Sequence, residues 1–236
     1  AGQTANFEID TLLPTITSIT SDTADGSYNL GDEINVIATF SEAVSLSGGN
    51  FVITLDSGGT VTITSITSST TANGTYTVGS GQTSADLTSS SIALSAGSLS
   101  DAAGNAMTDF SPSTNLAAGS ALVIDTTAPT VSSFTMSDTA LKSGETATVT
   151  LVFSEAVTAF ANADITVVNG SLSTMTTGDN ITWTGTYTPT ADVEDTTNVL
   201  TLATTYTDLA GNAGAAGQTA NFTIDTDTPS ISAIAT

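Results

Sequence analysis

The sequence predicts an all-β protein made of two tandem antiparallel β-sandwich domains, and three observations support this prediction. Short runs of alternating apolar and polar residues are separated by Gly, Asn, Asp and Ser, which is the pattern of strands and turns. The 236 residues are 39% hydrophobic and rich in Thr, Ser, Ala and Gly, a composition typical of β-rich chains. One segment also recurs at domain-sized intervals, which indicates repeated domains.

The recurring segment, Ile-Asp-Thr-x-x-Pro, marks the domain boundaries. Its aspartates are Asp10, Asp125 and Asp225, spaced by 115 and then 100 residues. Residues 1–10 and 216–225 agree at every position but the eighth. We therefore interpret residues 1–10 as the terminal strand of a preceding repeat and 226–236 as the first strand of a following one. Between them we expect one repeat at 11–125 and a second at 126–225.

The strands of the first repeat are expected where apolar and polar residues alternate. Strand A is predicted at Pro14–Thr20, strand B at Ile34–Phe40 and strand C at Phe51–Leu55. The remaining strands are predicted at Val61–Ile66, Gly74–Val78, Ser91–Leu94 and Ser120–Ile124. A proline at the entry to each repeat, at 14, 129 and 229, restricts the backbone before strand A.

The clearest strand of the second repeat is predicted at Ile181–Tyr187. Because side chains alternate along a strand, Ile181, Trp183 and Tyr187 share one face. The other face carries Thr182, Thr184 and Thr186. We expect Trp183 and Tyr187 to be core residues, and prefer this interpretation to ligand stacking by Trp183.

The charge balance restricts the partners of the chain. Twenty-three carboxylates face one basic side chain, Lys142, which gives a formal charge of −22. Nucleic acid and anionic lipid surfaces would repel such a chain, and no apolar run is long enough to predict membrane insertion. The acids either form a solubilising surface or bind divalent cations, of which Ca²⁺ best suits hard oxygen ligands.

The absence of two residue types excludes several kinds of chemistry. The sequence has no cysteine and no histidine, which excludes thiolate or imidazole zinc sites, thiol nucleophiles and Ser–His pairs. Clustered acids such as Asp192, Glu194 and Asp195 lie in a polar turn without the aromatic surroundings typical of glycosidases. We therefore expect no enzymatic activity and assign no catalytic residue.

Two further segments recur in step with the linkers. Phe-Ser-Glu-Ala-Val occupies positions 40–44 and again 153–157. Asp-x-Ala-Gly-Asn occupies positions 101–105 and again 208–212. The Gly and Asn of the second motif suit a tight turn with a residue at positive φ.

Together the three motifs, twice in the same order, resemble bacterial immunoglobulin-like repeats. That family fills the extender regions of giant surface adhesins of Gram-negative bacteria. The resemblance covers both repeats and implies two tandem Ig-like antiparallel β-sandwich domains arranged end to end. It further implies an extracellular stalk at the bacterial cell surface, with neighbouring repeats of the same chain as partners and Ca²⁺ bound near the domain junctions.

The geometry of an Ig-like sandwich independently predicts which acids meet. The chain enters strand A at the end that carries the B–C and F–G loops. The linker aspartate, the acid after strand B and the Asp–Asn turn should therefore lie together, ready to supply the six to eight oxygens that Ca²⁺ takes. The predicted ligands are Asp10, Glu42, Asp101 and Asn105 in the first repeat, Asp125, Glu155, Asp208 and Asn212 in the second, and Asp225 for a third.

Each predicted ligand has a plainer interpretation that stays open. Asp101 and Asp208 are also suited to cap turns through their own backbone. Glu42 and Glu155 are also suited to be solvent-facing loop acids. At the opposite pole of each repeat, another group of acids could complete a junction site from the neighbouring domain: Asp22, Asp25, Asp32, Asp138 and Glu145.

Three hypotheses of function follow. The leading one is a non-catalytic structural extender of a repetitive bacterial surface adhesin, with Ca²⁺ at the junctions rigidifying the array. The alternative is a subunit of an extracellular filament, a homo-polymer assembled head-to-tail when the end segments Ala1–Asp10 and Thr226–Thr236 add as strands to other copies. The third is binding of glycan or ice by the exposed Thr row of the second repeat.

Overall fold

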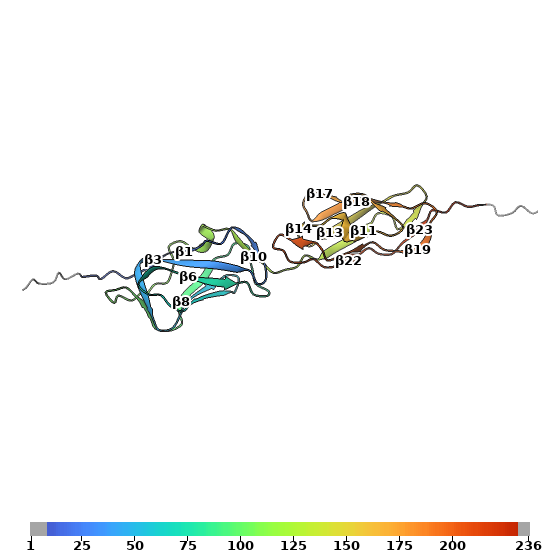
Figure 1. Cartoon of the computed structure of the whole chain (residues 1–236). Coiled ribbons are helices and arrows are strands. Elements are labelled where there is room, and N and C mark those ends of the chain that lie inside the picture. Colours follow the sequence, from blue (N-terminus) through green and yellow to red (C-terminus); the bar gives the residue numbers. More distant parts are fainter. Residues whose placement is uncertain (1–8, 231–236) are drawn as a thin grey trace, which may run out of the picture. The chain divides into compact units, whose positions relative to one another are not determined.

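The computed structural model describes residues 9–230, which divide into two compact units between Thr126 and Thr127 (Figure 1). We call these units domain 1 and domain 2. The division lies one residue from the boundary expected at Asp125/Thr126. Most of the two end segments expected to be orphan strands, 1–8 and 231–236, lies outside the described residues. No helix in the described part of the chain is long and apolar enough to cross a membrane.

The first sheet of domain 1 is antiparallel, with the order β1-β3-β6. Its long central strand bends away from the sheet at its far end and pairs there with the short strand β9. A register shift between Thr39 and Val44 accommodates the bend, as a β-bulge does. The elements are β1 (Ile16–Ser21), β3 (Glu33–Ser47), β6 (Ser69–Thr77) and β9 (Ser98–Ser100).

The opposing layer of domain 1 consists of two smaller sheets. One has the order β5-β4-β8, and in the other the last strand, β10, lies between a parallel and an antiparallel neighbour. The elements are β4 (Phe51–Leu55), β5 (Thr60–Ile63), β8 (Ser89–Leu94), β2 (Gly26–Tyr28), β7 (Thr83–Ser84), β10 (Leu122–Asp125) and the 3₁₀ turn η1 (Leu116–Ala118).

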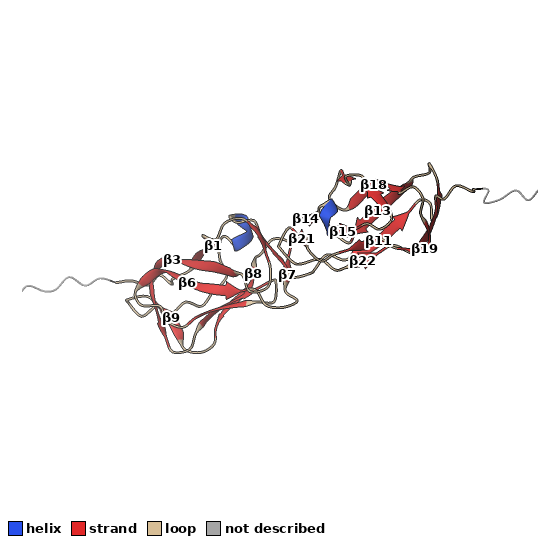
Figure 2. Ribbon diagram, turned by 45° about the vertical axis from the view of Figure 1, so that its right-hand side comes forward, coloured by secondary structure: helices blue, strands red, loops and turns tan. Residues whose placement is uncertain are grey.

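Domain 2 also has one larger sheet and an opposing layer of small sheets, but its strands are distributed differently between them. Its first sheet has the order β11-β13-β18-β16, with β17 also pairing β18. These strands are β11 (Val131–Met136), β13 (Ala147–Phe153), β16 (Gly170–Leu172), β17 (Thr176–Thr177) and β18 (Thr182–Pro189). Figure 2 shows strands with short helical turns in each domain, of which η2 (Asn162–Asp164) belongs to domain 2.

The second layer of domain 2 contains three small sheets, with the orders β15-β20-β22, β12-β23-β19 and β14-β21. As in domain 1, the last strand runs parallel to a short early strand, here β12. The elements are β15 (Ile165–Thr166), β20 (Thr201–Leu202), β22 (Gly217–Gln218), β12 (Ala140–Lys142), β23 (Phe222–Asp225), β19 (Glu194–Asn198), β14 (Val157–Thr158) and β21 (Thr207–Asp208).

Each domain encloses its own core between the two layers. In domain 1 the ring of Phe51 packs edge-on against Phe40, with 5.8 Å between centroids. In domain 2 the core is more aromatic, and Phe153 packs on Tyr206 at 4.7 Å. Trp183 is half-buried and contacts Phe160 at 4.8 Å, so it packs against the core as expected. Aromatic pairs of this kind stabilise a core beyond the area that they bury.

The strand positions agree with the sequence prediction where one face is buried. Strand C is observed at Phe51–Leu55, as predicted, and the strand predicted at Ile181–Tyr187 is observed as β18. Strand B extends beyond the predicted end at Phe40, because the bulge lets the chain continue in another sheet. The strand predicted to begin at Gly74 begins at Ser69, where small polar residues pair with β3 without an apolar pattern.

Candidate metal centre

The three acids predicted for domain 1 come from three separate segments. Asp10 precedes strand β1, Glu42 lies on the bend of β3, and Asp101 directly follows β9. Pairing of β9 with the end of β3 brings the last two segments together. The bend matters because a bulge redirects side chains that would otherwise alternate across the sheet.

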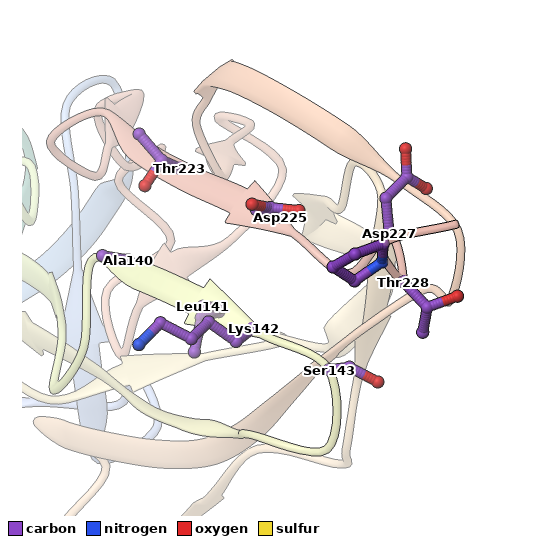
Figure 3. Close-up of a pocket in the computed structure, with 9 residues that line it drawn as sticks. Ala140, Leu141, Lys142, Ser143, Thr223, Asp225, Asp227 and Thr228 are labelled. Atoms are coloured by element: carbon purple, nitrogen blue, oxygen red, sulfur yellow. The ribbon is translucent and has the colours of Figure 1, made fainter. Parts of the chain in front are cut away.

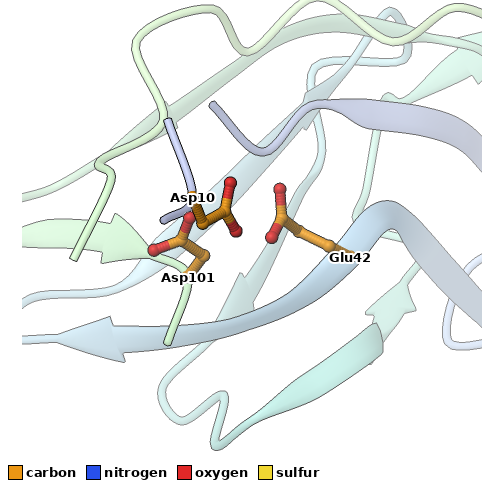
Figure 4. A group of neighbouring side chains, drawn as sticks. All are labelled: Asp10, Glu42 and Asp101. Carbon is orange, nitrogen blue, oxygen red and sulfur yellow. The ribbon is translucent and has the colours of Figure 1, made fainter. Parts of the chain in front are cut away.

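The carboxylates of this first acid group, Asp10, Glu42 and Asp101, converge (Figure 4). Each offers an oxygen, and these oxygens all lie within 4.8 Å of one another. Asp101 is only 8% exposed, Glu42 is half-buried and Asp10 is exposed. The only basic side chain in the sequence is Lys142 of domain 2, so domain 1 supplies none to balance this charge. Three like charges at this separation repel one another, and a bound cation would remove that repulsion.

The Asp101 carboxylate is held by the turn that follows it. Asn105 donates its backbone N–H to Oδ1 at 2.8 Å and its amide Nδ2 to Oδ2 at 2.7 Å. Gly104 closes the turn at φ +92°, a conformation that glycine adopts without strain. Asp101 therefore caps its turn and also directs its carboxylate to the acid group, so the two interpretations of this residue are compatible.

Asn105 has a different orientation from the one expected of an oxygen ligand. Its Nδ2 donates to the backbone oxygen of Asp10 at 3.2 Å as well as to Asp101. Both acceptors lie on the same side, so the amide presents nitrogen to them. In this arrangement Asn105 positions Asp101 and ties the entering chain to the turn.

The surroundings move the pKa values of two of these acids in opposite directions. Burial raises the pKa of Glu42 above its usual range, and the negative charges of Asp10 and Asp101 raise it further. Burial also tends to raise the pKa of Asp101, but the hydrogen bonds from Asn105 and from the backbone of Gly104 and Ala103 together outweigh it and lower that pKa. Asp101 is therefore held ionised while the third charge, on Glu42, is disfavoured.

Domain 2 repeats the local geometry of the turn. Asp208 is 2% exposed, and Asn212 donates its backbone N–H to Oδ1 at 2.9 Å and its Nδ2 to Oδ2 at 2.8 Å. Pairing of β14 with β21 sets Val157 opposite Asp208, and an oxygen of Glu155 lies within 4.8 Å of one of Asp208. Glu155 and Asp208 are therefore the acids of domain 2 that correspond to Glu42 and Asp101. Asp125 is the last residue of β10.

Sequence reasoning overlooked a serine beside each glutamate. Ser41 Oγ accepts the N–H of Thr15 at 3.0 Å, and the N–H of Ser41 donates to the Thr15 oxygen at 2.9 Å. Ser154 and Thr130 make the same pair of bonds, at 2.9 and 2.8 Å. These bonds fix the entry of strand A against the segment that carries the glutamate. The signal was present in the repeated Phe-Ser-Glu-Ala-Val, where only the acid was singled out.

Asp225 has a different environment. It ends β23, with Lys142 and Glu194 as its neighbours in register. It lines an open pocket of about 490 Å³ together with Lys142 and Asp227 (Figure 3). Among the described residues, Asp225 belongs to no group of three converging acids. Its role as a ligand remains a prediction.

The acids at the opposite pole of each domain hold loops of their own domain. Asp32 accepts the N–H of Asn29 at 2.8 Å, and Glu145 accepts that of Lys142 at 2.9 Å. Three others also accept hydrogen bonds within their domain: Asp22 from Asn35, Asp25 from Ala121 and Asp138 from Ala140. These contacts account for the acids as turn and loop residues.

Two tandem sandwiches, each with its last strand parallel to a short early strand, define an Ig-like architecture. Residues 125–224 match the family model described as "Bacterial Ig-like domain", and domain 2 is accordingly a bacterial Ig-like domain. A solved three-domain immunoglobulin segment of titin, in an E-to-A mutated variant, is similar at 11% identity. That match covers 92% of this chain and 66% of the titin chain, with a TM-score of 0.39. No curated protein matches the chain.

Proposed function

We propose that this chain is a non-catalytic extender of a repetitive bacterial surface adhesin, and that Ca²⁺ bound by its acid groups rigidifies the array. The observation that carries the proposal is the convergence of Asp10, Glu42 and Asp101, with oxygens within 4.8 Å of one another. The match of domain 2 to bacterial Ig-like domains supports the coarser conclusion, a structural repeat module.

The proposed mechanism is a cation that joins the entering chain to the body of the domain. Asp10 lies before strand β1, whereas Glu42 and Asp101 belong to the folded sandwich. A Ca²⁺ ion shared by all three would neutralise their repulsion and fix the direction in which the chain enters. The remaining oxygens of the six to eight that Ca²⁺ takes would come from backbone carbonyls and water.

The same arrangement is proposed for Glu155 and Asp208 of domain 2 with the linker residue Asp125. Asp208 is held by its turn as Asp101 is, and Glu155 and Asp125 have the sequence positions of Glu42 and Asp10. Each ion would therefore act on the residue that precedes its domain. Ca²⁺ is favoured over Mg²⁺ because three carboxylates on separate segments suit a flexible oxygen site better than a strict octahedron.

Folding would be linked to the cation. Without Ca²⁺ the like charges oppose closure of the site, and with Ca²⁺ the binding energy favours the folded domain. Outside a bacterial cell, where Ca²⁺ is plentiful, this linkage would produce a stiff stalk. The partners would be neighbouring repeats of the same chain, and the location the bacterial cell surface.

The test is thermal unfolding of the chain in Ca²⁺, in Mg²⁺ and in EDTA. We expect a rise of the midpoint in Ca²⁺ alone, which Asp101→Asn reduces and which the exposed control Asp86→Asn leaves intact. Small-angle scattering in the same buffers should show a longer, stiffer particle in Ca²⁺. An equal midpoint in Ca²⁺ and EDTA, with no change in length, would contradict the proposal.

A further inference from the structure

One strand of domain 1 has an edge that no other strand covers in the described part of the chain. Strand β8 is last in the order β5-β4-β8 and pairs with β4 alone. Just after β8, the N–H of Ser95 donates to the Asn50 oxygen. Just after β20 of domain 2, the N–H of Ala203 donates to the Asp164 oxygen in the same way, so β20 is the counterpart of β8. It lies between β15 and β22 and is covered on both sides.

The missing neighbour leaves two apolar side chains only partly buried. Leu202 of β20 faces Gly217 of the covering strand and is 3% exposed. Its counterpart Leu94, together with Ile92, is only partly buried against the core of domain 1. Between them Ala93 is exposed, because side chains alternate along a strand. A strand added beside β8 would bury more of both apolar side chains, which is favourable.

The backbone of β8 presents unpaired groups along the same edge. The strand runs antiparallel to β4, and the N–H of Ser95 points to that strand. The alternation of an antiparallel pair therefore directs the N–H and C=O groups of Ile92 and Leu94 to the other side. A row of donors and acceptors of this kind is a template for another strand.

A side chain covers this edge only at its beginning. Asn115 donates its Nδ2 to the Ser89 oxygen at 2.9 Å, and its Oδ1 accepts the Ser89 N–H at 3.0 Å. The amide thus satisfies one residue of β8 as a neighbouring strand would. Its Oδ1 also accepts the N–H of Leu116, so the side chain is used locally and leaves the edge open from Ile92 onward.

The surface beside this edge is uncharged. A groove of about 440 Å³ borders it, with residues 89–92 on one side and Phe110, Ser111, Pro112 and Asn115 on the other. Strand β8 carries neither a charge nor a proline, the features that commonly protect natural edges. In a chain of formal charge −22, another uncharged strand of the same chain meets little local repulsion here. A cationic partner would be attracted more strongly to the faces that carry acids.

Strand β8 is complementary to a second copy of itself. In an antiparallel pairing centred on Ala93, Ile92 of one copy would face Leu94 of the other on both sides of a two-fold axis. The outward N–H and C=O groups of these residues would then satisfy one another. The two Ala93 residues would meet at the closer antiparallel spacing, about 4.5 Å between Cα atoms, which suits a small exposed side chain.

We propose that β8 of domain 1 pairs antiparallel with β8 of a second copy of the chain, so that two sheets continue as one in the order β5-β4-β8-β8-β4-β5. Ile92 and Leu94 of each copy would cover Leu94 and Ile92 of the other. Two chains would thereby associate side by side through domain 1, whereas the covered β20 of domain 2 would take no part. Because the net charges of the copies repel, association should strengthen as salt screens them.

Disulfide trapping tests the register, because the sequence has no cysteine. In the proposed pair, Ala93→Cys faces its own twin at a Cα separation of about 4.5 Å, which a disulfide can bridge. Ser91→Cys, also exposed on β8, would lie four residues out of register with its twin and is the matched control. Under mild oxidation we expect Ala93→Cys to form disulfide-linked dimers about tenfold faster than Ser91→Cys.

A mixture of single variants sharpens this test. In the proposed register Ser91 of one copy faces Ser95 of the other, so Ser91→Cys mixed with Ser95→Cys should form the mixed dimer much faster than either variant dimerises alone. Equal rates for Ala93→Cys and Ser91→Cys would overturn the proposal. So would fast dimerisation of Ser91→Cys alone, because it would require a different register.

Sedimentation of the unmodified chain provides the second test. The mean mass should rise toward that of a dimer with concentration and with salt. Ala93→Asp sets two carboxylates directly opposite each other and should weaken association about tenfold or more. Thr62→Asp is the control, because Thr62 is exposed and faces Val52 as Ala93 does, on the far side of β4. It adds the same charge to the same sheet and should leave association unchanged.

A monomer at every concentration and salt level would contradict the proposal, as would equal weakening by Ala93→Asp and Thr62→Asp. Strand β8 carries none of the acids assigned to Ca²⁺. Failure of self-association would therefore leave the Ca²⁺-dependent rise of the unfolding midpoint as expected, and the two proposals can fail separately.

Discussion

Domain 1 and domain 2 present the same turn and glutamate on differently arranged sheets. In domain 1 the strand β3 runs unbroken through the bend that carries Glu42, whereas in domain 2 the chain leaves β13 at Phe153 and resumes as β14 at Val157. After strand C, domain 1 adds β5 to the same sheet, while domain 2 places β16 beside β18. The geometry around Asp101 and Asp208 is nevertheless the same within about 0.1 Å in its hydrogen bonds.

This comparison shows which parts of the fold the acid site requires. It requires an Asp–Asn turn, a glutamate beside it, and a serine that ties strand A to the glutamate segment. It does not require a particular number of strands. The stability that the sheets contribute and the geometry of the acid site can therefore be changed independently, and the following predictions use this independence.

The largest effect is expected from truncation in the core. Phe51→Ala and Phe153→Ala should each cost about 3–5 kcal/mol, because each removes a buried ring and leaves a cavity. Trp183 is the single tryptophan and reports on domain 2. In urea, Phe153→Ala should therefore shift the fluorescence transition, and Phe51→Ala should shift only the remaining part of the circular dichroism signal. An equal fluorescence shift from both variants would show that the domains unfold together.

Loss of one acid should remove the effect of Ca²⁺ from its own domain. At a hundred times its Kd, a ligand stabilises the folded state by about 2.7 kcal/mol. Asp208→Asn should abolish this gain in the Trp183 transition, and Asp101→Asn should preserve it. Both variants should be measured in EDTA as well, where neither should show the gain that Ca²⁺ produces. A Ca²⁺ gain that survives in both variants would contradict the assigned ligands.

The asparagines should matter less than the acids that they hold. Asn105→Ala removes the Nδ2 amide, which donates to Asp101 Oδ2 and to the Asp10 backbone oxygen, and we expect Ca²⁺ binding to domain 1 to weaken about tenfold. The backbone donor remains in the variant, so the loss is partial. Calorimetric titration of Asn105→Ala and Asn212→Ala should give similar losses in their respective domains. If Asn105 were itself an essential ligand, its removal would instead abolish binding.

The turn glycines provide a smaller, matched test. Gly104 and Gly211 both have φ of +92°. A Cβ added at Gly104 would meet no neighbouring atom within 4 Å. Gly104→Ala should therefore cost about 1 kcal/mol from backbone strain alone. Gly119→Ala, also in open space but without positive φ, serves as the control in the same domain. Urea denaturation should show the loss for Gly104→Ala and little change for Gly119→Ala.

The pH dependence should distinguish Glu42 from Asp101. The folded pKa of Glu42 is raised, so its contribution to stability is present below its unfolded pKa and is lost as pH rises through the folded pKa. The folded pKa of Asp101 is lowered, so its contribution is present above its unfolded pKa and is lost as pH falls through the folded pKa.

Protons and Ca²⁺ should therefore compete at Glu42 first. Binding of Ca²⁺ to domain 1 should weaken as pH falls through the raised pKa of Glu42, above the pH at which an ordinary glutamate titrates. Titrations of Ca²⁺ at a series of pH values measure this shift. Glu42→Gln should bind more weakly and lose this component of the pH dependence. An unchanged pH profile in Glu42→Gln would assign the competition to another acid.

The sequence by itself determined the repeat, the β class and the acids that come together. Alternation of apolar and polar residues requires one buried face, which is why Phe51–Leu55 could be placed without the structure. The identical Phe-Ser-Glu-Ala-Val and the Asp-x-Ala-Gly-Asn turns are local devices, so their spacing carried over to both domains. The same local character explains why the turn-capping role of Asp101 could be predicted, whereas its role as a ligand stays a prediction.

Only the tertiary structure decided features that depend on which strands meet. The extension of β3 to Ser47, the placement of β5 and β16 in different layers and the uncovered edge of β8 all depend on pairing between distant segments. The orientation of the Asn105 amide was likewise decided by its two acceptors, because an asparagine offers both a donor and an acceptor. Sequence patterns report the burial of a side chain, whereas pairing reflects the free energy of the whole sandwich.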